Sequence, residues 1–143
     1  MISHGISSSG LFCIVNIYYE RSRRRSLFIN KGLLGVIPTF SLMLFFLCAA
    51  NVSAPPTINL LSEISLMIRV LAYDLFILLV FPVGSFLGAV FTFYLFSLRQ
   101  HGKLGARNLN FYSVKVRDLH SLALHVIPLN FLVLKSEIFF VWL

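Results

Sequence analysis

A single carboxylate lies in a stretch of this chain that otherwise suits a lipid environment. Glu63 is surrounded by Leu, Ile and Ser, and Asn59 precedes it by about one helical turn, on the same face. An ionised acid at the centre of a bilayer costs about 2.5–3.5 kcal/mol, so it normally faces a packed interior, a partner group or water. The spacing of Glu63 and Asn59 therefore predicts a polar stripe on one helical face, where the carboxyl group exchanges protons with water. The alternative is that Glu63 only hydrogen-bonds to a neighbouring helix.

A second titratable group stands near the start of the sequence. His4 shares a helical face with Ser7 and Ser8. Imidazole is the side chain that most readily gains and loses a proton near neutral pH, so His4 is a candidate for the same proton relay. A histidine near an exposed terminus, with no chemical task, fits the spacing equally well.

The composition places these residues in a membrane protein. Hydrophobic residues make up 58% of the 143 residues and charged residues 12%, whereas soluble domains carry about 45–50% and about 25%. Cys13 and Cys48 lie in apolar segments without a neighbouring ligand pattern, so neither a metal site nor a disulfide is expected. We predict an all-α fold, a polytopic transmembrane helix bundle forming a single membrane domain over residues 1–143.

About five membrane segments are expected, at residues 1–19, 33–51, 57–73, 75–98 and 119–134. The third would be a helix of only roughly 25 Å, shorter than a hydrocarbon core of ~30 Å. Pro55 and Pro56 directly precede it and remove two N–H donors. A short, Pro-interrupted segment that carries an acid is typical of transport sites, so we predict a broken helix here. In the fourth segment, Gly84 and Gly88 have the small-xxx-small spacing that predicts a close helix contact.

The formal net charge of +7 comes mostly from two predicted loops, residues 20–31 and 99–118. Beside membrane segments, such clusters contact water and phosphate headgroups. The sequence contains no basic soluble domain that would present them to DNA or RNA. The lipid bilayer, and not a nucleic acid, is therefore the expected partner of these basic residues.

Four strings of the sequence together resemble one protein family. They are residues 1–5 (MISHG) leading to 19–21 (YER), residues 54–63 (APPTINLLSE), residues 94–103 (YLFSLRQHGK) and residues 125–129 (HVIPL). In this order and spacing they are similar to the C-terminal part of subunit 4 of mitochondrial NADH:ubiquinone oxidoreductase, respiratory complex I. The resemblance spans nearly the whole chain, which is only about a third of that family's usual length.

The resemblance implies an antiporter-like, multi-pass subunit that moves protons across the mitochondrial inner membrane. It assigns His4 to the family's central chain of polar residues and Glu63 to its terminal acid. It implies other membrane subunits of complex I as partners, and an enzyme that is an NADH:ubiquinone reductase coupled to proton translocation. NADH, FMN, iron–sulfur clusters and ubiquinone would belong to the parent complex. No Gly-rich phosphate loop or Cys cluster is present here, so we expect this chain to bind none of them.

Two other functions remain open at the level of sequence. One is a subunit of a multi-subunit Na⁺/H⁺ antiporter, which would use an intramembrane acid and an imidazole in the same way. The other is a fragment that packs as a scaffold and conducts nothing.

Overall fold

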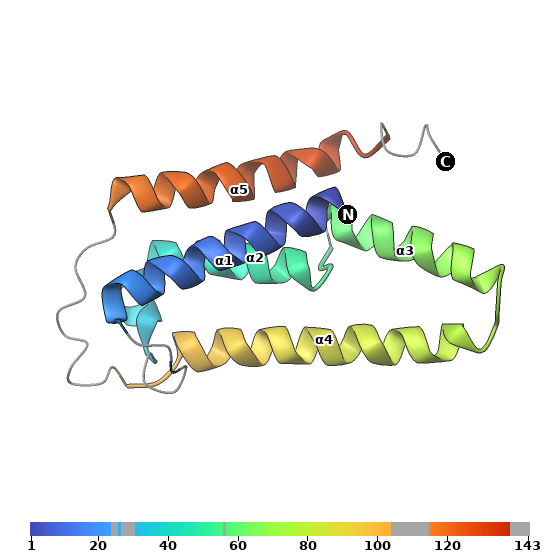
Figure 1. Cartoon of the computed structure of the whole chain (residues 1–143), viewed down its shortest axis with the longest axis horizontal. Coiled ribbons are helices and arrows are strands. Elements are labelled where there is room, and N and C mark those ends of the chain that lie inside the picture. Colours follow the sequence, from blue (N-terminus) through green and yellow to red (C-terminus); the bar gives the residue numbers. More distant parts are fainter. Residues whose placement is uncertain (24–25, 27–30, 56, 104–114, 138–143) are drawn as a thin grey trace.

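The computed structural model describes residues 1–23, 26, 31–55, 57–103 and 115–137. Within these residues there are five α-helices, one short 3-10 helix and no β-strand, which confirms the all-α prediction (Figure 1). The elements are α1 (Ile2–Ser22), η1 (Leu33–Gly35), α2 (Pro38–Asn51), α3 (Ile58–Leu71), α4 (Ile77–Gln100) and α5 (Val116–Leu134). Among the described helices, α4 alone is long and apolar enough to cross a membrane, with a mean hydropathy of 2.0. Membrane crossing by the other four helices stays a prediction.

Local sequence explains where the first helices begin and end. α1 ends at Arg23, which adopts a left-handed conformation with φ 53°, and its N–H donates to the carbonyl of Tyr19 over 2.8 Å. α2 begins with Pro38 in its first turn, where the missing N–H would have no partner in any case. The apolar run from Leu33 onward therefore divides into the short η1 turn and α2, where one continuous segment was expected.

The predicted Pro-interrupted helix is not confirmed. α3 runs without interruption from Ile58 to Leu71, and Pro55 lies in the connection before it, while Pro56 lies outside the described residues. The prolines therefore separate α2 from α3, because proline cannot continue the hydrogen bonding of an arriving helix. Figure 1 shows that α3 follows α2 along the long axis of the molecule.

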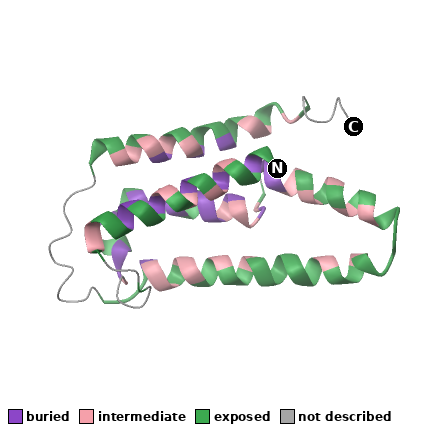
Figure 2. Cartoon of the chain, viewed as in Figure 1, coloured by how far each residue is buried: buried purple, intermediate pink, exposed green. Residues whose placement is uncertain are grey.

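The core lies where α1, α2 and α5 pack together, as the buried residues in Figure 2 show. Its most enclosed side chains include Ile14 of α1, Phe40 and Leu47 of α2, and Leu122 of α5. The ring of Tyr18 meets that of Phe40 edge to face, with 4.9 Å between the ring centroids, a geometry that aromatic pairs prefer. Apolar packing between these three helices thus holds one half of the molecule together.

The other half, α3 and α4, is largely exposed. Within α4 only Gln100 is buried, and within α3 only Ile58 and Asn59. Gln100 Oε1 accepts a 2.6 Å hydrogen bond from the hydroxyl of Ser41, which fixes the C-terminal end of α4 to α2. The rest of α4 presents apolar side chains outward, which suits lipid or another protein surface and not water.

Positive charge collects at one end of the molecule. The C-terminal ends of α1 and α4 and the N-terminal end of α5 all lie there (Figure 1). They bring Arg21, Arg99 and Arg117 to the same end. Both predicted basic loops start or finish at this end, although residues 24–25, 27–30 and 104–114 of those loops lie outside the described residues.

Candidate functional site

The predicted acid lies close to the connection between α2 and α3. Glu63 is in the second turn of α3, and its side chain is half-buried. Its Oε1 accepts a 2.5 Å hydrogen bond from the hydroxyl of Ser53. Within the described residues this is the hydrogen bond that the Glu63 carboxylate makes, so Ser53 is its partner and His4 is not.

The backbone after α2 places that hydroxyl. Ser53 is buried and adopts φ 58°, a left-handed conformation that is uncommon for residues other than glycine. Its N–H donates to the carbonyl of Ala50 over 3.2 Å, and the next N–H, of Ala54, donates to Ala49 over 3.0 Å. These bonds close the end of α2 and turn the chain, which brings the Ser53 hydroxyl to the carboxylate ten residues further along.

Asn59 takes part in the same junction. Its amide Nδ2 donates a 2.6 Å hydrogen bond to the carbonyl of Ala50, and its side chain is buried. The carbonyls at the end of a helix lack partners within the helix and carry its negative dipole end, so an amide donor satisfies them well. Asn59 therefore fastens α3 to the end of α2. Its predicted role in the relay is a separate function, which this bond does not test.

His4 lies on the exposed surface of α1, near the N-terminus. The hydroxyl of Ser7 donates to the carbonyl of His4 over 3.0 Å, and that of Ser8 donates to the carbonyl of Gly5 over 3.1 Å. These serines therefore hydrogen-bond to their own helix and not to the imidazole. α1 contacts α3, and Figure 1 shows the N-terminus beside the start of α3. His4 is at the same end of α1 as this contact, without a direct bond to Glu63.

The two glycines predicted to mediate helix packing have open surroundings. Gly84 and Gly88 are exposed, and no described atom lies within 4 Å of a Cβ placed at either. Their predicted contact with another helix is therefore not tested within the described chain. A close approach does occur at Gly10, where an added Cβ would lie 2.9 Å from Leu47 Cδ2 and 3.3 Å from His125 Cβ. Gly10 thus lets α2 and α5 approach α1. The helical spacing of Ser3, Ser7 and Gly10, all small and all buried, is the sequence signal that would have indicated it.

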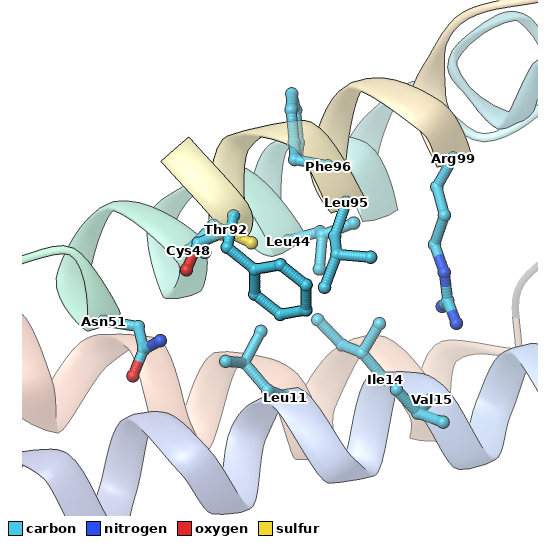
Figure 3. Close-up of a pocket in the computed structure, with 11 residues that line it drawn as sticks. Leu11, Ile14, Val15, Leu44, Cys48, Asn51, Thr92, Leu95, Phe96 and Arg99 are labelled. Carbon is cyan, nitrogen blue, oxygen red and sulfur yellow. The ribbon is translucent and has the colours of Figure 1, made fainter. Parts of the chain in front are cut away.

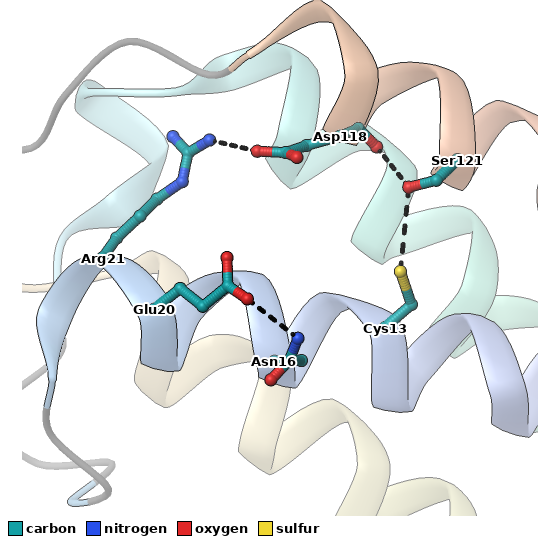
Figure 4. Close-up of polar contacts among 6 residues, drawn as sticks. All are labelled: Cys13, Asn16, Glu20, Arg21, Asp118 and Ser121. Atoms are coloured by element: carbon teal, nitrogen blue, oxygen red, sulfur yellow. Dashed lines mark hydrogen bonds and ion pairs between the residues drawn. The ribbon is translucent and has the colours of Figure 1, made fainter.

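Sequence reasoning also missed the polar contacts between α1 and α5 (Figure 4). Arg21 Nη2 and Asp118 Oδ2 form an ion pair of 2.6 Å, and their side chains are only 11% and 14% exposed. Further along the two helices, Cys13 Sγ lies 3.8 Å from the hydroxyl of Ser121. Asp118 is in the first turn of α5, where a negative charge is favoured by the helix dipole. The position of Asp118 at the start of a helix could have indicated a structural role for its charge. Its partner, Arg21, lies 97 residues away in the sequence and could not be predicted from spacing.

The Glu63–Ser53 pair suits proton exchange. A hydroxyl both donates and accepts, so the pair can stay hydrogen-bonded whether the carboxyl is ionised or protonated. Within the described residues, no group of three His, Cys, Asp or Glu side chains gathers closely enough to hold a metal ion. The carboxyl group of Glu63 beside the Ser53 hydroxyl can take part in acid–base chemistry.

Comparisons with known proteins agree on one family. A family model described as NADH:quinone oxidoreductase/Mrp antiporter, TM matches residues 1–92. Proteins named NADH-ubiquinone oxidoreductase chain 4 match the whole chain, with 47% identity in Anopheles arabiensis and 46% in Aedes aegypti. The protein of that name from Branchiostoma lanceolatum is 33% identical over 98% of this chain. The chain spans 65% of the Anopheles protein, 32% of the Aedes protein and 31% of the Branchiostoma protein.

Proposed function

Because the chain belongs to the NADH:quinone oxidoreductase/Mrp antiporter transmembrane family, we propose that it is part of a proton-translocating membrane subunit of respiratory complex I. The name shared by its relatives, NADH-ubiquinone oxidoreductase chain 4, supports this proposal. The complex would work in the mitochondrial inner membrane as an NADH:ubiquinone reductase coupled to proton translocation. Electron transfer through NADH, FMN, iron–sulfur clusters and ubiquinone would occur in other subunits. This chain would bind none of these cofactors and would contribute the path for protons.

The exposed half of the molecule supports the membrane placement. α4 is apolar along its length and almost entirely uncovered, which in water would be unfavourable and in lipid is expected. We propose that α1, α2, α3 and α5 also lie in the membrane, with the break at Pro55 dividing α2 from α3. A break between two half-helices near the acid is the arrangement that places polar groups at the middle of a bilayer.

The proton path is carried by one observation, the bond from the Ser53 hydroxyl to the Glu63 carboxylate. When Glu63 is ionised, the hydroxyl donates to it, and when Glu63 is protonated, the hydroxyl can accept from it. The carboxyl group can thus gain and lose a proton without leaving its place. The side chain is only half-buried by the described residues, so one side of the carboxyl group is left open to a further hydrogen-bonding partner. The Ser53–Glu63 pair is therefore a proton-exchange station at the end of α2.

Asn59 and His4 would complete the proton relay, Asn59 by holding Glu63 in position and His4 by exchanging protons with it through water. Asn59 holds α3 against the end of α2, so its amide keeps Glu63 at a fixed distance from Ser53. His4 is exposed in the first turn of α1, a helix that contacts α3, and bound water could link its imidazole to the carboxyl. Neutral imidazole accepts a proton at one nitrogen and donates from the other, which suits a group that passes protons along water.

A second candidate function is a subunit of a multi-subunit Na⁺/H⁺ antiporter. The family description names the Mrp antiporter beside the quinone oxidoreductase, and an acid such as Glu63 would serve either. The relatives' printed names favour complex I. A non-conducting scaffold is the third candidate, and the tight packing of α1, α2 and α5 would suffice for it.

The test is proton pumping by the assembled complex that contains Glu63→Gln. Glutamine keeps the shape and can still hydrogen-bond to Ser53, but it cannot carry a proton. We expect assembly at the wild-type level with proton uptake and NADH-driven ubiquinone reduction reduced at least tenfold, and with Glu63→Asp intermediate.

Glu137→Gln is the matched control, since Glu137 is exposed and makes no bond to a described residue. It should pump like the wild type. Ser53→Ala should slow pumping less than Glu63→Gln does, because it removes the hydroxyl and leaves the titrating group. Wild-type rates and stoichiometry in assembled Glu63→Gln complex would instead support the scaffold.

A further inference from the structure

A groove between α1, α2 and α4 has apolar walls and a positive charge at one end (Figure 3). Its volume is about 480 Å³, within the range of roughly 300–1,000 Å³ that small-molecule sites occupy. Leu11 of α1, Leu44 of α2 and Leu95 of α4 are among its lining residues. Arg99, one turn further along α4 than Leu95, closes one end (Figure 3). The groove is therefore amphipathic, with its cation at the basic end of the molecule.

The guanidinium of Arg99 is held in place without an acid. Its Cζ lies 5.0 Å from the ring centroid of Tyr18, a cation–π contact that fixes the orientation of the group. Among the described residues, no carboxylate forms an ion pair with Arg99. Asp118, an acid at this end of the molecule, is paired with Arg21. A half-buried cation that lacks an acidic partner within the described chain favours an anion from outside it.

A second cation stands at the same end of α4. Gly102, just past the end of α4, is covered by the side chain of Lys31, whose Cβ would lie 3.2 Å from a Cβ placed at Gly102. Of these two residues Arg99 is the one that lines the groove, and it stands where a headgroup would sit if the apolar groove held an acyl chain. Basic pockets between membrane helices bind anionic headgroups in this way.

We propose that this groove binds an anionic phospholipid, with one acyl chain along the apolar wall and the phosphate on the guanidinium of Arg99. The charge fits an anionic lipid better than a zwitterionic one, since the cation has no acid beside it to receive a choline or ethanolamine group. The lipid would fill the space between α4 and the packed helices α1 and α2. This inference rests on the membrane placement proposed above and not on the proton relay.

The experiment labels the full-length chain, in its complex, with photoreactive phosphatidylglycerol or photoreactive phosphatidylcholine in phosphatidylcholine vesicles. Labelled peptides are then mapped. We expect phosphatidylglycerol to label the groove residues of α1, α2 and α4 in preference to phosphatidylcholine. Arg99→Gln should reduce that preference about fivefold, the effect of one basic residue on anionic lipid binding. Arg69→Gln is the matched control, because Arg69 is an exposed arginine on α3 that does not line the groove.

A second variant, Leu95→Trp, fills the groove and should lower labelling there by either lipid while α4 is labelled on its outer face as before. Equal labelling of the groove by the two lipids, or an unchanged preference in Arg99→Gln, would overturn the proposal. So would cross-links from the groove to another protein segment in place of lipid. Phosphatidylcholine labelling of the outer face of α4 reports membrane placement separately, so its absence would contradict that placement and not only the groove.

Discussion

The two halves of this molecule keep their shape by different means. α1, α2 and α5 bury apolar side chains against one another and add an ion pair and an aromatic contact. α3 and α4 bury few side chains. The bond from Asn59 fixes α3, while α4 is held by the bond to Gln100 and by Phe96, which packs against the core and meets Phe45 edge to face. The candidate acid lies at the boundary, bonded to the turn that ends the packed half. The comparison indicates that the packed half sets the position of the acid, while the exposed half presents an apolar surface that the described residues leave uncovered.

The largest expected effect is at Gly10, where a Cβ would meet side chains of both α2 and α5. Gly10→Leu would place a side chain where a Cβ alone already meets Leu47 at 2.9 Å. Overpacking at such a contact costs about 3 kcal/mol. The thermal unfolding midpoint of the purified complex should fall, together with its assembled amount on a native gel.

Gly5→Leu is the control for that change, in the same helix. No described atom lies within 4 Å of a Cβ at Gly5, so this variant should unfold close to the wild-type midpoint. Equal destabilisation by the two variants would mean that the packed half is not organised around Gly10.

The next largest effect is expected at the ion pair between α1 and α5. Asp118→Asn removes the charge that pairs with Arg21 at a site where both side chains are nearly enclosed. Hydrogen bonds to charged groups contribute about 1.5–3 kcal/mol, so we expect a loss of about 2 kcal/mol in the free energy of unfolding.

Glu20→Gln tests whether burial is the reason that Asp118→Asn lowers the free energy of unfolding. Glu20 is an exposed carboxylate in a side-chain hydrogen bond, accepting from Asn16 over 3.3 Å (Figure 4). Exposed pairs contribute about 0–1 kcal/mol, so this variant should change the unfolding midpoint far less than Asp118→Asn. A larger effect at Glu20 would contradict the assignment of stability to the enclosed pair.

The smallest effect on the fold itself is expected in the exposed half. Gly88→Leu adds a side chain where nothing in the described chain lies within 4 Å. If a partner helix covers this face, as the small-xxx-small spacing predicts, the variant should reduce the assembled complex more than Val83→Leu does, with little change in the chain's own helicity by circular dichroism. Equal yields of assembled complex for the two variants would show that no helix packs on Gly88.

Much of the helix content was predictable from the sequence, because its causes are local. Pro38 starts α2, Pro55 separates α2 from α3, and the apolar run that becomes α4 has few polar interruptions. These features act within a few residues along the chain. The Pro-interrupted helix predicted for the third segment is not confirmed, because α3 begins after the prolines and runs without a break from Ile58 to Leu71.

What could not be predicted is which helix faces meet. Gly10 and Leu47, or Arg21 and Asp118, are far apart in sequence, and periodicity gives a face to each helix without naming its neighbour. The partner of Glu63 was missed for another reason. Ser53 reaches the carboxylate only because its backbone takes the left-handed conformation, which serine rarely adopts and which no residue pattern here indicated.

The most direct test asks whether Glu63 changes protonation during turnover. Infrared difference spectra of the active complex, recorded with and without NADH, contain the C=O band of any carboxylic acid that gains or loses a proton. We predict a turnover-dependent band that is missing in Glu63→Gln, is shifted in Ser53→Ala because the hydrogen bond to the carboxyl is lost, and is unchanged in Glu137→Gln. An identical carboxylic-acid band in the wild type and in assembled Glu63→Gln complex would contradict the claim that Glu63 carries the proton.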